Sequence, residues 1–259
     1  MGTVQPWLRR RRPGMTAGVS PSALPFLAAP FVGSFLGVLV RRLPEGLPVV
    51  VGRSRCEACG HRLNLVDLIP IASFLLQWGR CRHCRAAIAP AHLWIEVAAC
   101  AVPATAVWFG PDAPWLWADC VLGWALLALG WIDWTHLRLP DVLTLPLVLA
   151  GLAATAWLDP ASAPDHALAA ACGYVALTAL AALYRRWRGR EGLGVGDAKL
   201  LAASGAWVGL AGLGPVLLVA AVAGVMAALL RGDGLRAQTV IPLGTCLAVG
   251  TWAVRLLLP

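Results

Sequence analysis

The stretch that decides the fold is WLWADCVLGWALLALGWI at residues 115–132, an apolar run that leads directly into Asp133. A helix that crosses the hydrocarbon core of a membrane needs roughly 20 mostly apolar residues, and fewer where protein neighbours cover it. The run is therefore predicted to span a membrane and to end on an acid. Asp119 lies about 14 residues before Asp133, or roughly 21 Å along a helix, so we expect it near the opposite surface.

The composition extends this prediction to the whole chain. Of the 259 residues, 59% are hydrophobic and 13% are charged, and the mean hydropathy is +0.73. A soluble domain is nearer half apolar and a quarter charged, and a soluble chain of this length cannot hide so much apolar surface. Disordered chains are poor in hydrophobic residues, so disorder is excluded too. The sequence predicts an all-α, polytopic membrane protein that contacts the lipid bilayer along most of its length.

Eight stretches are long and apolar enough to be spans. They are Leu24–Leu43, Leu93–Phe109, Trp115–Ile132, Asp141–Leu158, Ala167–Tyr184, Leu200–Leu213, Pro215–Leu230 and Val240–Leu257. The sixth is the shortest of them. The fold class is thus about eight transmembrane helices, joined by connections of contrasting charge.

The basic residues give the orientation. The net charge is +8, and the bases gather in alternate connections: residues 44–92, Arg138, residues 185–199, and Arg231 with Arg236. Basic residues mark the cytoplasmic ends of spans, so these connections are predicted to be cytoplasmic and both chain ends external. This explanation of the charge is favoured over nucleic-acid binding, and no nucleic-acid partner is expected.

One basic run opposes this orientation. Arg9–Arg12 lie at the supposedly external N-terminus and, with the apolar stretch after them, resemble the start of a secretory signal. No small-residue cleavage site follows, however. We favour the hypothesis that translation begins at Met15, which would place part of residues 1–23 upstream of the true start.

Four of the eight cysteines form two pairs in the first basic connection. Cys56 and Cys59, like Cys81 and Cys84, are separated by two residues. Two such pairs can close a tetrahedral site around one zinc ion, and the 21 residues between the pairs suit a zinc ribbon. The reducing cytoplasm makes disulfides unsuitable here. A closed four-sulfur site leaves no open position for substrate, so the zinc is expected to be structural.

The same connection contains an apolar patch from Leu63 to Trp78 and two histidines, His61 and His83, that are possible substitute ligands. We favour the interpretation that this patch forms a small core, packed on the metal-binding cysteine turns or on the bilayer surface, over the interpretation that it is a substrate groove. The other four cysteines lie in apolar stretches and are expected to be packing residues.

Two aspartates beside predicted spans carry the strongest functional signal. Asp133 ends the third span, and Asp197 precedes the sixth within Gly194-Val-Gly196-Asp197-Ala-Lys199. Acids beside hydrocarbon are costly and point to function. Both lie at cytoplasmic ends, so they can meet at one depth and share a proton. One acid can then activate water while the other protonates or polarises a scissile carbonyl. Gly194 and Gly196 would let the backbone approach a substrate closely.

Two neighbouring charges have simpler explanations. Asp141 follows Pro140 at a helix start, where a carboxylate complements exposed amide groups, and this capping role is favoured over chemistry. Lys199 could pair with an acid or mark the cytoplasmic interface.

Together these motifs resemble the type IV prepilin peptidases, bifunctional leader peptidases and N-methyltransferases that are membrane aspartic peptidases of the Gly-x-Gly-Asp type. The similarity runs from about Phe31 to Leu247. It rests on the following segments: Gly33-Ser-Phe-Leu with Arg42-Leu-Pro44; the four-cysteine loop that begins at Arg53; Asp67-Leu-Ile-Pro70; Ile95-Glu96; Leu139-Pro-Asp-Val-Leu-Thr-Leu-Pro146; Glu191-Gly-Leu-Gly-Val-Gly-Asp-Ala-Lys-Leu200; and Ile241-Pro-Leu-Gly244.

The resemblance implies the site and the reaction. Asp133 and Asp197 fall on the catalytic pair, with Gly194, Gly196 and Lys199 in the active-site loop. The family cuts prepilins and pseudopilins after a Gly at the cytoplasmic face of the bacterial inner membrane, then methylates the new N-terminal amine with S-adenosylmethionine. The implied division is an N-terminal segment 1–23, a first span 24–43, a methyltransferase-associated zinc segment 44–92, and a seven-helix peptidase region 93–259.

Three positions depart from the family pattern. Gly37 stands where the first span usually has Asn, Leu68 where Asp-Asn-Ile-Pro has Asn, and Glu57 where Pro is common inside the first cysteine pair. All three lie in or beside the segment linked with methyl transfer. We therefore expect efficient cleavage and slower methylation. The alternatives are a peptidase without efficient methyl transfer, a non-catalytic scaffold anchored by zinc, and a transporter, although no acid lies at mid-membrane as a transporter would need.

Overall fold

The computed structural model describes residues 22–49, 54–109, 113–189, 192–230 and 242–257. The Arg9–Arg12 run and the Met15 hypothesis lie outside these residues. The long helices are α1 (Leu24–Arg42), α3 (Ala91–Phe109), α4 (Ala113–His136), α5 (Asp141–Leu158), α6 (Ala163–Arg188), α7 (Val195–Leu230) and α8 (Leu243–Leu257). A 3-10 turn, η2 (Leu65–Leu68), and the short helix α2 (Ala72–Leu76) lie in the cysteine segment. The all-α prediction is confirmed, and no β-strand occurs among the described residues.

The helices agree closely with the predicted spans. Six of those described, all the long ones except the shorter apolar helix α8, are long and apolar enough to cross a membrane. The bounds of α5 are those predicted, whereas α6 extends beyond the predicted Ala167–Tyr184 at both ends. Helix α4 continues to His136, so Asp133 lies inside its last turn rather than just after it. Leu137, with φ of 53°, then turns the chain toward α5.

The predicted boundary between the sixth and seventh spans is wrong by several residues. Gly214 was expected to separate them, but α7 continues through Pro215 and breaks instead at Gly209, where φ is 69° and ψ is −177°. Only glycine adopts this conformation at low cost. Along α8, Thr251 contacts Ser204, Val254 lies beside Gly212, and Gly250 lies against Val216 and Ala220. The second limb of α7 therefore runs back along α8, and the two predicted stretches are the two limbs of one broken helix.

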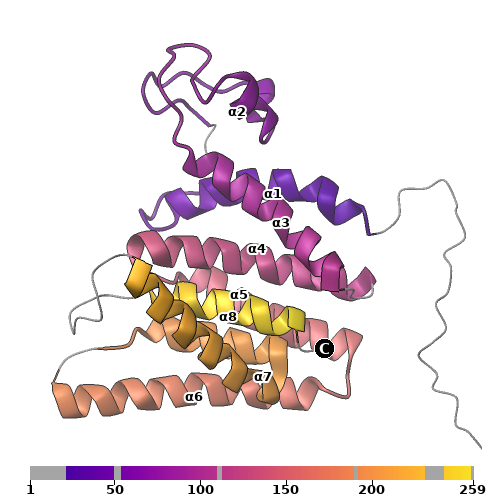
Figure 1. Cartoon of the computed structure of the whole chain (residues 1–259), viewed down its shortest axis with the longest axis vertical. Coiled ribbons are helices and arrows are strands. Elements are labelled where there is room, and N and C mark those ends of the chain that lie inside the picture. Colours follow the sequence, from indigo (N-terminus) through magenta and orange to yellow (C-terminus); the bar gives the residue numbers. More distant parts are fainter. Residues whose placement is uncertain (1–21, 50–53, 110–112, 190–191, 231–241, 258–259) are drawn as a thin grey trace, which may run out of the picture.

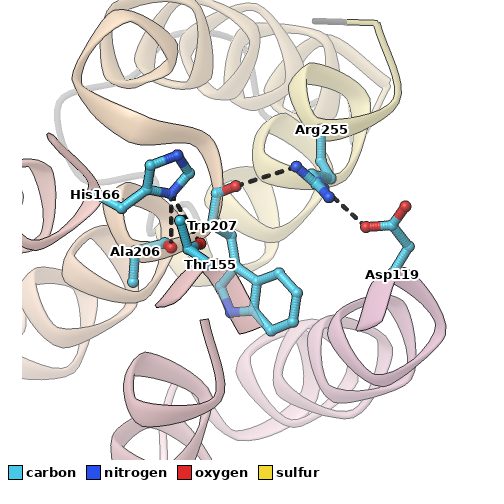
Figure 2. A network of polar contacts seen from close by, with 6 residues as sticks. All are labelled: Asp119, Thr155, His166, Ala206, Trp207 and Arg255. Atoms are coloured by element: carbon cyan, nitrogen blue, oxygen red, sulfur yellow. Dashed lines mark hydrogen bonds and ion pairs between the residues drawn. The ribbon is translucent and has the colours of Figure 1, made fainter. Parts of the chain in front are cut away.

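Polar side chains from neighbouring helices satisfy the backbone groups that the break exposes (Figure 2). His166 Nδ1 donates to the carbonyl of Ala206 at 3.0 Å, and Arg255 Nη1 donates to the carbonyl of Trp207 at 3.5 Å. On the other side of Gly209, the amide of Leu210 donates to Asp165 at 2.9 Å. Unsatisfied backbone groups are costly in a membrane, so these contacts allow the chain to reverse within the bundle.

Asp119 lies near the end of α4 that is opposite Asp133, as its position in the sequence requires. It is buried, however, and accepts a hydrogen bond from Arg255 Nε at 2.8 Å in an ion pair (Figure 2). Arg255 also lies over the ring of Trp115 at 4.5 Å. The sequence did not predict this pair, because its two residues lie 136 positions apart.

The helices pack around two buried apolar clusters that share α4. One cluster lies between α1, α3 and α4, and the other lies between α4, α5, α6, α7 and α8. Figure 1 shows α1 and α3 on one side of α4 and the remaining long helices on the other, with the cysteine segment next to α1 and α3. The molecule therefore has an aspartate half (α4–α8) and a cysteine half (α1–α3 and the segment between α1 and α3).

Candidate active site and cysteine cluster

Asp133 is held by the last predicted span. Its side chain is buried, with 5% of the residue exposed, and its Oδ2 accepts hydrogen bonds from the amide and the hydroxyl of Thr245 at 2.7 and 3.2 Å. The same hydroxyl also lies 2.9 Å from the carbonyl oxygen of Gly130. The start of α8 therefore orients one oxygen of the Asp133 carboxyl group.

Asp197 is held by the glycine loop in front of α7. Its Oδ2 accepts a hydrogen bond from the amide of Gly194 at 3.2 Å, and its own amide donates to the carbonyl of Gly194 at the same distance. The Asp133 and Asp197 carboxyl groups are near enough to interact electrostatically. The structure thus brings together the two acids that were selected from the topology.

Leu139 closes the site between the two acids. A Cβ atom at Gly196 would lie 2.9 Å from Leu139 Cβ, and one at Gly244 would lie 2.9 Å from Asp133 Cγ. Larger residues at these two positions would displace Leu139 or Asp133. Gly196 therefore makes room for Leu139, while Gly194 supplies the amide to Asp197. Close approach of this loop to a substrate, as the sequence suggested, stays a prediction.

Lys199 and Asp141 pair with each other and not with the dyad. Lys199 Nζ lies 2.6 and 2.7 Å from the two oxygens of Asp141. Pro140 occupies the N-cap position of α5 and makes no side-chain cap bond, so Asp141 is the first residue of the helix. An acid in this first turn complements the exposed amide groups, as the sequence predicted, and Asp141 also pairs with Lys199 of α7. The pair joins the starts of α5 and α7 beside Asp197.

The arrangement suits acid–base chemistry on a carbonyl group. Two carboxyl groups share one electrostatic environment, each holds a fixed hydrogen bond from a backbone amide, and a mostly helical wall surrounds them. Such a pair can exchange one proton between water and a bound amide. Among the described residues, the grouped metal-ligating side chains lie elsewhere, in the cysteine segment.

The four cysteines lie on two similar turns. In the first, the amide of Cys56 donates to the carbonyl of His61, and Gly60 takes a positive φ of 68°. In the second, the amide of Cys81 donates to the carbonyl of Ala86, and Arg85 takes a positive φ of 60°. Each turn is closed by one antiparallel bridge, and His61 stacks on His83 between them. The two turns therefore present their thiols toward a common point.

The cluster has the dimensions that zinc requires. All four sulfur atoms lie within 4.8 Å of one another, and Cys56 Sγ is 3.8 Å from Cys84 Sγ. Zn–S bonds of about 2.3 Å in a tetrahedron place sulfur atoms about 3.8 Å apart. The predicted cysteine ligands are thus brought together, and their chemistry is compatible with zinc.

The thiols also differ in how readily they ionise. Hydrogen bonds from the amides of Cys59 and Ala58 lower the pKa of Cys56 to about 7. For Cys84, the amide of Ala86 lowers the pKa, but burial and the neighbouring thiols outweigh it and raise the pKa to about 11. The backbone amides therefore favour the thiolate at Cys56, which is the form in which cysteine binds a metal ion.

A cavity of about 660 Å³ lies between the cysteine segment and the ends of α1 and α3. Its lining residues all come from positions 34–96, so none comes from α4–α8. Arg41 bonds both Glu57, in the first cysteine turn, and Nε2 of His92, at 3.2 Å. The volume falls in the usual range of small-molecule sites, roughly 300–1,000 Å³.

Two acids line this cavity. Glu96 lies on α3, only 9% of the residue is exposed, and its Oε2 accepts a hydrogen bond from the amide of Ile71 at 2.7 Å. Asp67 accepts bonds from Gln77, just after α2, at 3.1 Å and from Arg82, in the second cysteine turn, at 3.3 Å. These acids therefore bond to backbone and side chains of the cysteine segment that surrounds the cavity.

The three departures from the family pattern lie at or near this cavity. Leu68 lines it, and Glu57 both lines it and pairs with Arg41. Gly37 is not part of the wall. A Cβ atom there would lie 3.4 Å from Nδ1 of His92, and His92 does line the cavity. The structure therefore places two departures in the wall of this cavity and the third next to a residue of the wall.

Two residues that position the sites were missed or underused by sequence reasoning. Thr245 directly follows the recognised Ile241-Pro-Leu-Gly244 segment, but nothing in its sequence neighbourhood indicates that its hydroxyl reaches Asp133 across the bundle. Glu96 belongs to the recognised Ile95-Glu96 pair, yet its bond to Ile71 joins residues 25 positions apart. An acid within an apolar span was the available signal.

Comparison with known proteins identifies the family of the chain. The family description "Bacterial Peptidase A24 N-terminal domain" matches residues 27–109, and "Type IV leader peptidase family" matches residues 120–229. The prepilin leader peptidase/N-methyltransferase of Burkholderia pseudomallei is 40% identical over 248 residues, which cover 85% of this chain and 80% of the relative.

The corresponding Pseudomonas aeruginosa protein is 35% identical over 250 residues, covering 87% of this chain and 86% of the relative. The type 4 prepilin-like proteins leader peptide-processing enzyme of Escherichia coli O78:H11 is 32% identical over 254 residues, covering 89% and 93%. No solved structure matches the chain significantly. From the match of both family segments and the extent of these similarities, the chain belongs to the type IV leader peptidase family and is a multi-pass protein of the inner membrane.

Proposed function

We propose that this chain cleaves prepilins or pseudopilins with the Asp133–Asp197 pair and then methylates the new N-terminus. The observation that carries the proposal is the electrostatic proximity of two carboxyl groups from α4 and α7, of which Asp133 is held by the amide of Thr245 and Asp197 by the amide of Gly194. The names of the relatives, which specify leader peptidase and N-methyltransferase, support both reactions.

The peptidase step follows from two acids that share one proton. One carboxylate takes a proton from a water molecule as the water oxygen attacks the scissile carbonyl carbon, and the other carboxyl gives its proton to the carbonyl oxygen. When the tetrahedral species collapses, the C–N bond breaks. The proton taken from water passes to the leaving amine, and the second acid regains its own. Thr245 and Gly194 hold the two carboxyl groups in place throughout.

The substrate is expected to reach the acids from the cytoplasmic face. Asp133 lies in the last turn of α4, and Arg138 follows five residues later; Asp197 lies in the first turn of α7, shortly after the basic end of α6. The positive-inside rule places these helix ends in the cytoplasm. A prepilin whose apolar segment lies in the membrane would present its leader junction at this depth. Cleavage after Gly is the specificity that the family resemblance implies.

For methyl transfer, the cavity beside the cysteine cluster is the proposed donor site. S-adenosylmethionine supplies an electrophilic methyl group on a sulfonium cation, with an ammonium and a carboxylate on the same molecule. The cavity offers acids for the cations, including Glu96 and Asp67, and the guanidinium groups of Arg41 and Arg42 for the carboxylate. The zinc proposed for the four cysteines would hold the wall of this cavity and take no part in the reaction.

The test is cleavage and methylation of a co-expressed prepilin, read together by mass spectrometry. Asp133→Asn and Asp197→Asn should each abolish cleavage at normal abundance, because Asn keeps the size of Asp but cannot exchange the proton. Asp141→Asn is the matched control: it lies near the same cytoplasmic end but pairs with Lys199, and it should retain most of the activity.

Full cleavage by either dyad variant would refute the assignment of the acids. Complete inactivation by Asp141→Asn would show that the Lys199 pair belongs to the catalytic machinery. Methylation of a pre-cleaved pilin by the two dyad variants would show that the second reaction uses a separate site.

A further inference from the structure

The cysteine segment exposes an apolar surface that the two proposed reactions do not use. In η2 and α2 no residue is buried, and Leu65 is 86% exposed, Leu76 81% and the nearby Trp78 88%. The predicted small core on the metal-binding cysteine turns is therefore not formed by these residues. Side chains this apolar are unfavourable in water unless something covers them.

Helix α2 has two different faces. Ser73, Phe74 and Gln77 line the cavity, whereas Leu75, Leu76 and the neighbouring Trp78 point away from it into open space. Residues in the left-handed region stand at both ends of the helix, with φ of 61° at Ile71 and 53° at Trp78. Such conformations are costly for bulky and β-branched residues and persist only where the surroundings impose them. The backbone is thus held so that α2 presents this apolar edge outward.

The position of α2 puts this edge at the membrane. The amide of Ile71, just before α2, donates to Glu96, which lies five residues, or roughly 7 Å, after the start of α3 at Ala91. In Figure 1 the cysteine segment lies beside the C-terminal half of α1, the half that ends at Arg42. It does not lie beyond the end of that helix. The exposed edge is therefore level with the first turns of a span.

The charges of the segment match a lipid surface. Within residues 54–89 the bases are Arg55, Arg62, Arg80, Arg82 and Arg85, and all five are exposed. The two acids of that stretch, Glu57 and Asp67, already pair with Arg41 and Arg82. Anionic lipids of the cytoplasmic leaflet attract such basic clusters, and Trp favours the membrane interface.

We propose that Leu65, Leu76 and Trp78 insert into the cytoplasmic leaflet beside α1 and α3, with the surrounding arginines on anionic headgroups. The inference rests on the proposed orientation, but not on either reaction. It has a consequence for methyl transfer, because lipid contact on one face of α2 would hold its other face as a wall of the cavity. An apolar segment of a prepilin is the competing occupant.

The test uses the full-length, zinc-loaded protein in nanodiscs of phosphatidylethanolamine with phosphatidylglycerol and no prepilin. Leu76 and, in a second variant, Trp78 are replaced by the photo-crosslinking residue p-benzoylphenylalanine. The control replaces His83, an exposed aromatic residue between Cys81 and Cys84, in the same way. Mass spectrometry after irradiation should find phospholipid on positions 76 and 78 at least tenfold more often than on position 83. Without phosphatidylglycerol, the yield at 76 should fall about threefold.

Two results would overturn the proposal. One is a lipid yield at 76 and 78 no higher than at 83, in variants that keep their zinc and cleave prepilin. The other is a crosslink from position 76 to added prepilin, in a protein that gives no lipid crosslink when prepilin is absent. That result would assign the surface to the substrate. The lipid crosslink does not require peptidase activity, so it does not depend on whether an Asp133→Asn protein cleaves prepilin. Failure of the lipid proposal and failure of the proposed function are therefore distinguishable.

Discussion

The aspartate half and the cysteine half are built on opposite principles, although α4 belongs to the packing of both. In the aspartate half, long helices are joined by buried polar contacts: Arg255 with Asp119, Thr245 with Asp133, and Ser204 with Thr251. In the cysteine half, short turns outside the long helices carry four thiols that converge on one point, and they are held by bonds to Glu96 and Asp67. The difference teaches that one site depends on helix packing and the other on local bonds and on the zinc ion proposed for the thiols, so each can be damaged separately.

The largest effect should come from removing the metal ligands. Cys81→Ser should release zinc and unfold the segment, since a structural zinc ion contributes roughly 10–16 kcal/mol of binding free energy that is coupled to local folding. Methylation should fall more than 100-fold. Cleavage should fall only a fewfold, because the lining of the cavity and the acid dyad have no residue in common.

The measurement combines zinc content, limited proteolysis between Arg55 and Arg85, and mass spectrometry of the product. Cys100→Ser, in span α3, is the matched control and should change none of these. Stoichiometric zinc in a protein lacking all four loop thiols would contradict the assignment. Equal loss of both activities would contradict the independence of the two halves.

The next effect concerns the buried ion pair of the aspartate half. Arg255→Leu leaves Asp119 buried and unpaired, and this should cost about 3–5 kcal/mol of stability. The change also removes the donor to the carbonyl of Trp207 beside the α7 break (Figure 2). Thermal unfolding in detergent should show the loss, while zinc content stays normal.

Replacement of both partners, with Asp119→Leu added, should recover part of this stability, because no buried charge then remains. If Arg255→Leu unfolds no earlier than the unaltered protein, the pair contributes nothing, and the aspartate half is held by apolar packing alone.

A smaller effect is expected from Thr245→Val, which keeps the amide bond to Asp133 and removes the hydroxyl. Loss of one hydrogen bond to a carboxylate costs about 1.5 kcal/mol, or about tenfold in kcat for cleavage. Thr245→Ser should restore the rate, since it returns the hydroxyl. The rate of methylation of a pre-cleaved pilin should be unchanged in both variants. A lower methylation rate would show that the surroundings of Asp133 affect the cavity.

The smallest effect concerns the departures at the cavity. Gly37→Asn with Leu68→Asn should raise the rate at which cleaved pilin is methylated about fivefold, because a positioned amide can return roughly 1 kcal/mol of hydrogen bonding. Space at Gly37 is tight but adequate, since a Cβ atom there lies 3.4 Å from His92 Nδ1 and 3.5 Å from Ile95 Cγ2. If the unaltered enzyme already methylates every cleaved molecule as fast as it cleaves, the departures are harmless.

The local parts of the fold and of both sites were predictable because their signals lie close together in the chain. Apolar runs predicted α5 to the residue and the other long helices to within a few residues, since span length is set by the bilayer. The spacing of the two cysteine pairs predicted a cluster whose sulfur atoms do meet. The alternation of bases placed Asp133 and Asp197 at one end of the bundle, and the structure brings their carboxyl groups together.

What the sequence by itself determined is therefore the membrane class, the order of the passes, the two acids and the four thiols, all of which follow from composition and short spacing. Only the tertiary structure decided which distant side chains meet: Thr245 with Asp133, Lys199 with Asp141, Arg255 with Asp119, and Glu96 with Ile71. It also decided that the turn between the sixth and seventh passes is at Gly209. The physical reason is that these contacts join residues 25 to 136 positions apart, and helix packing, which no short pattern encodes, sets which faces meet.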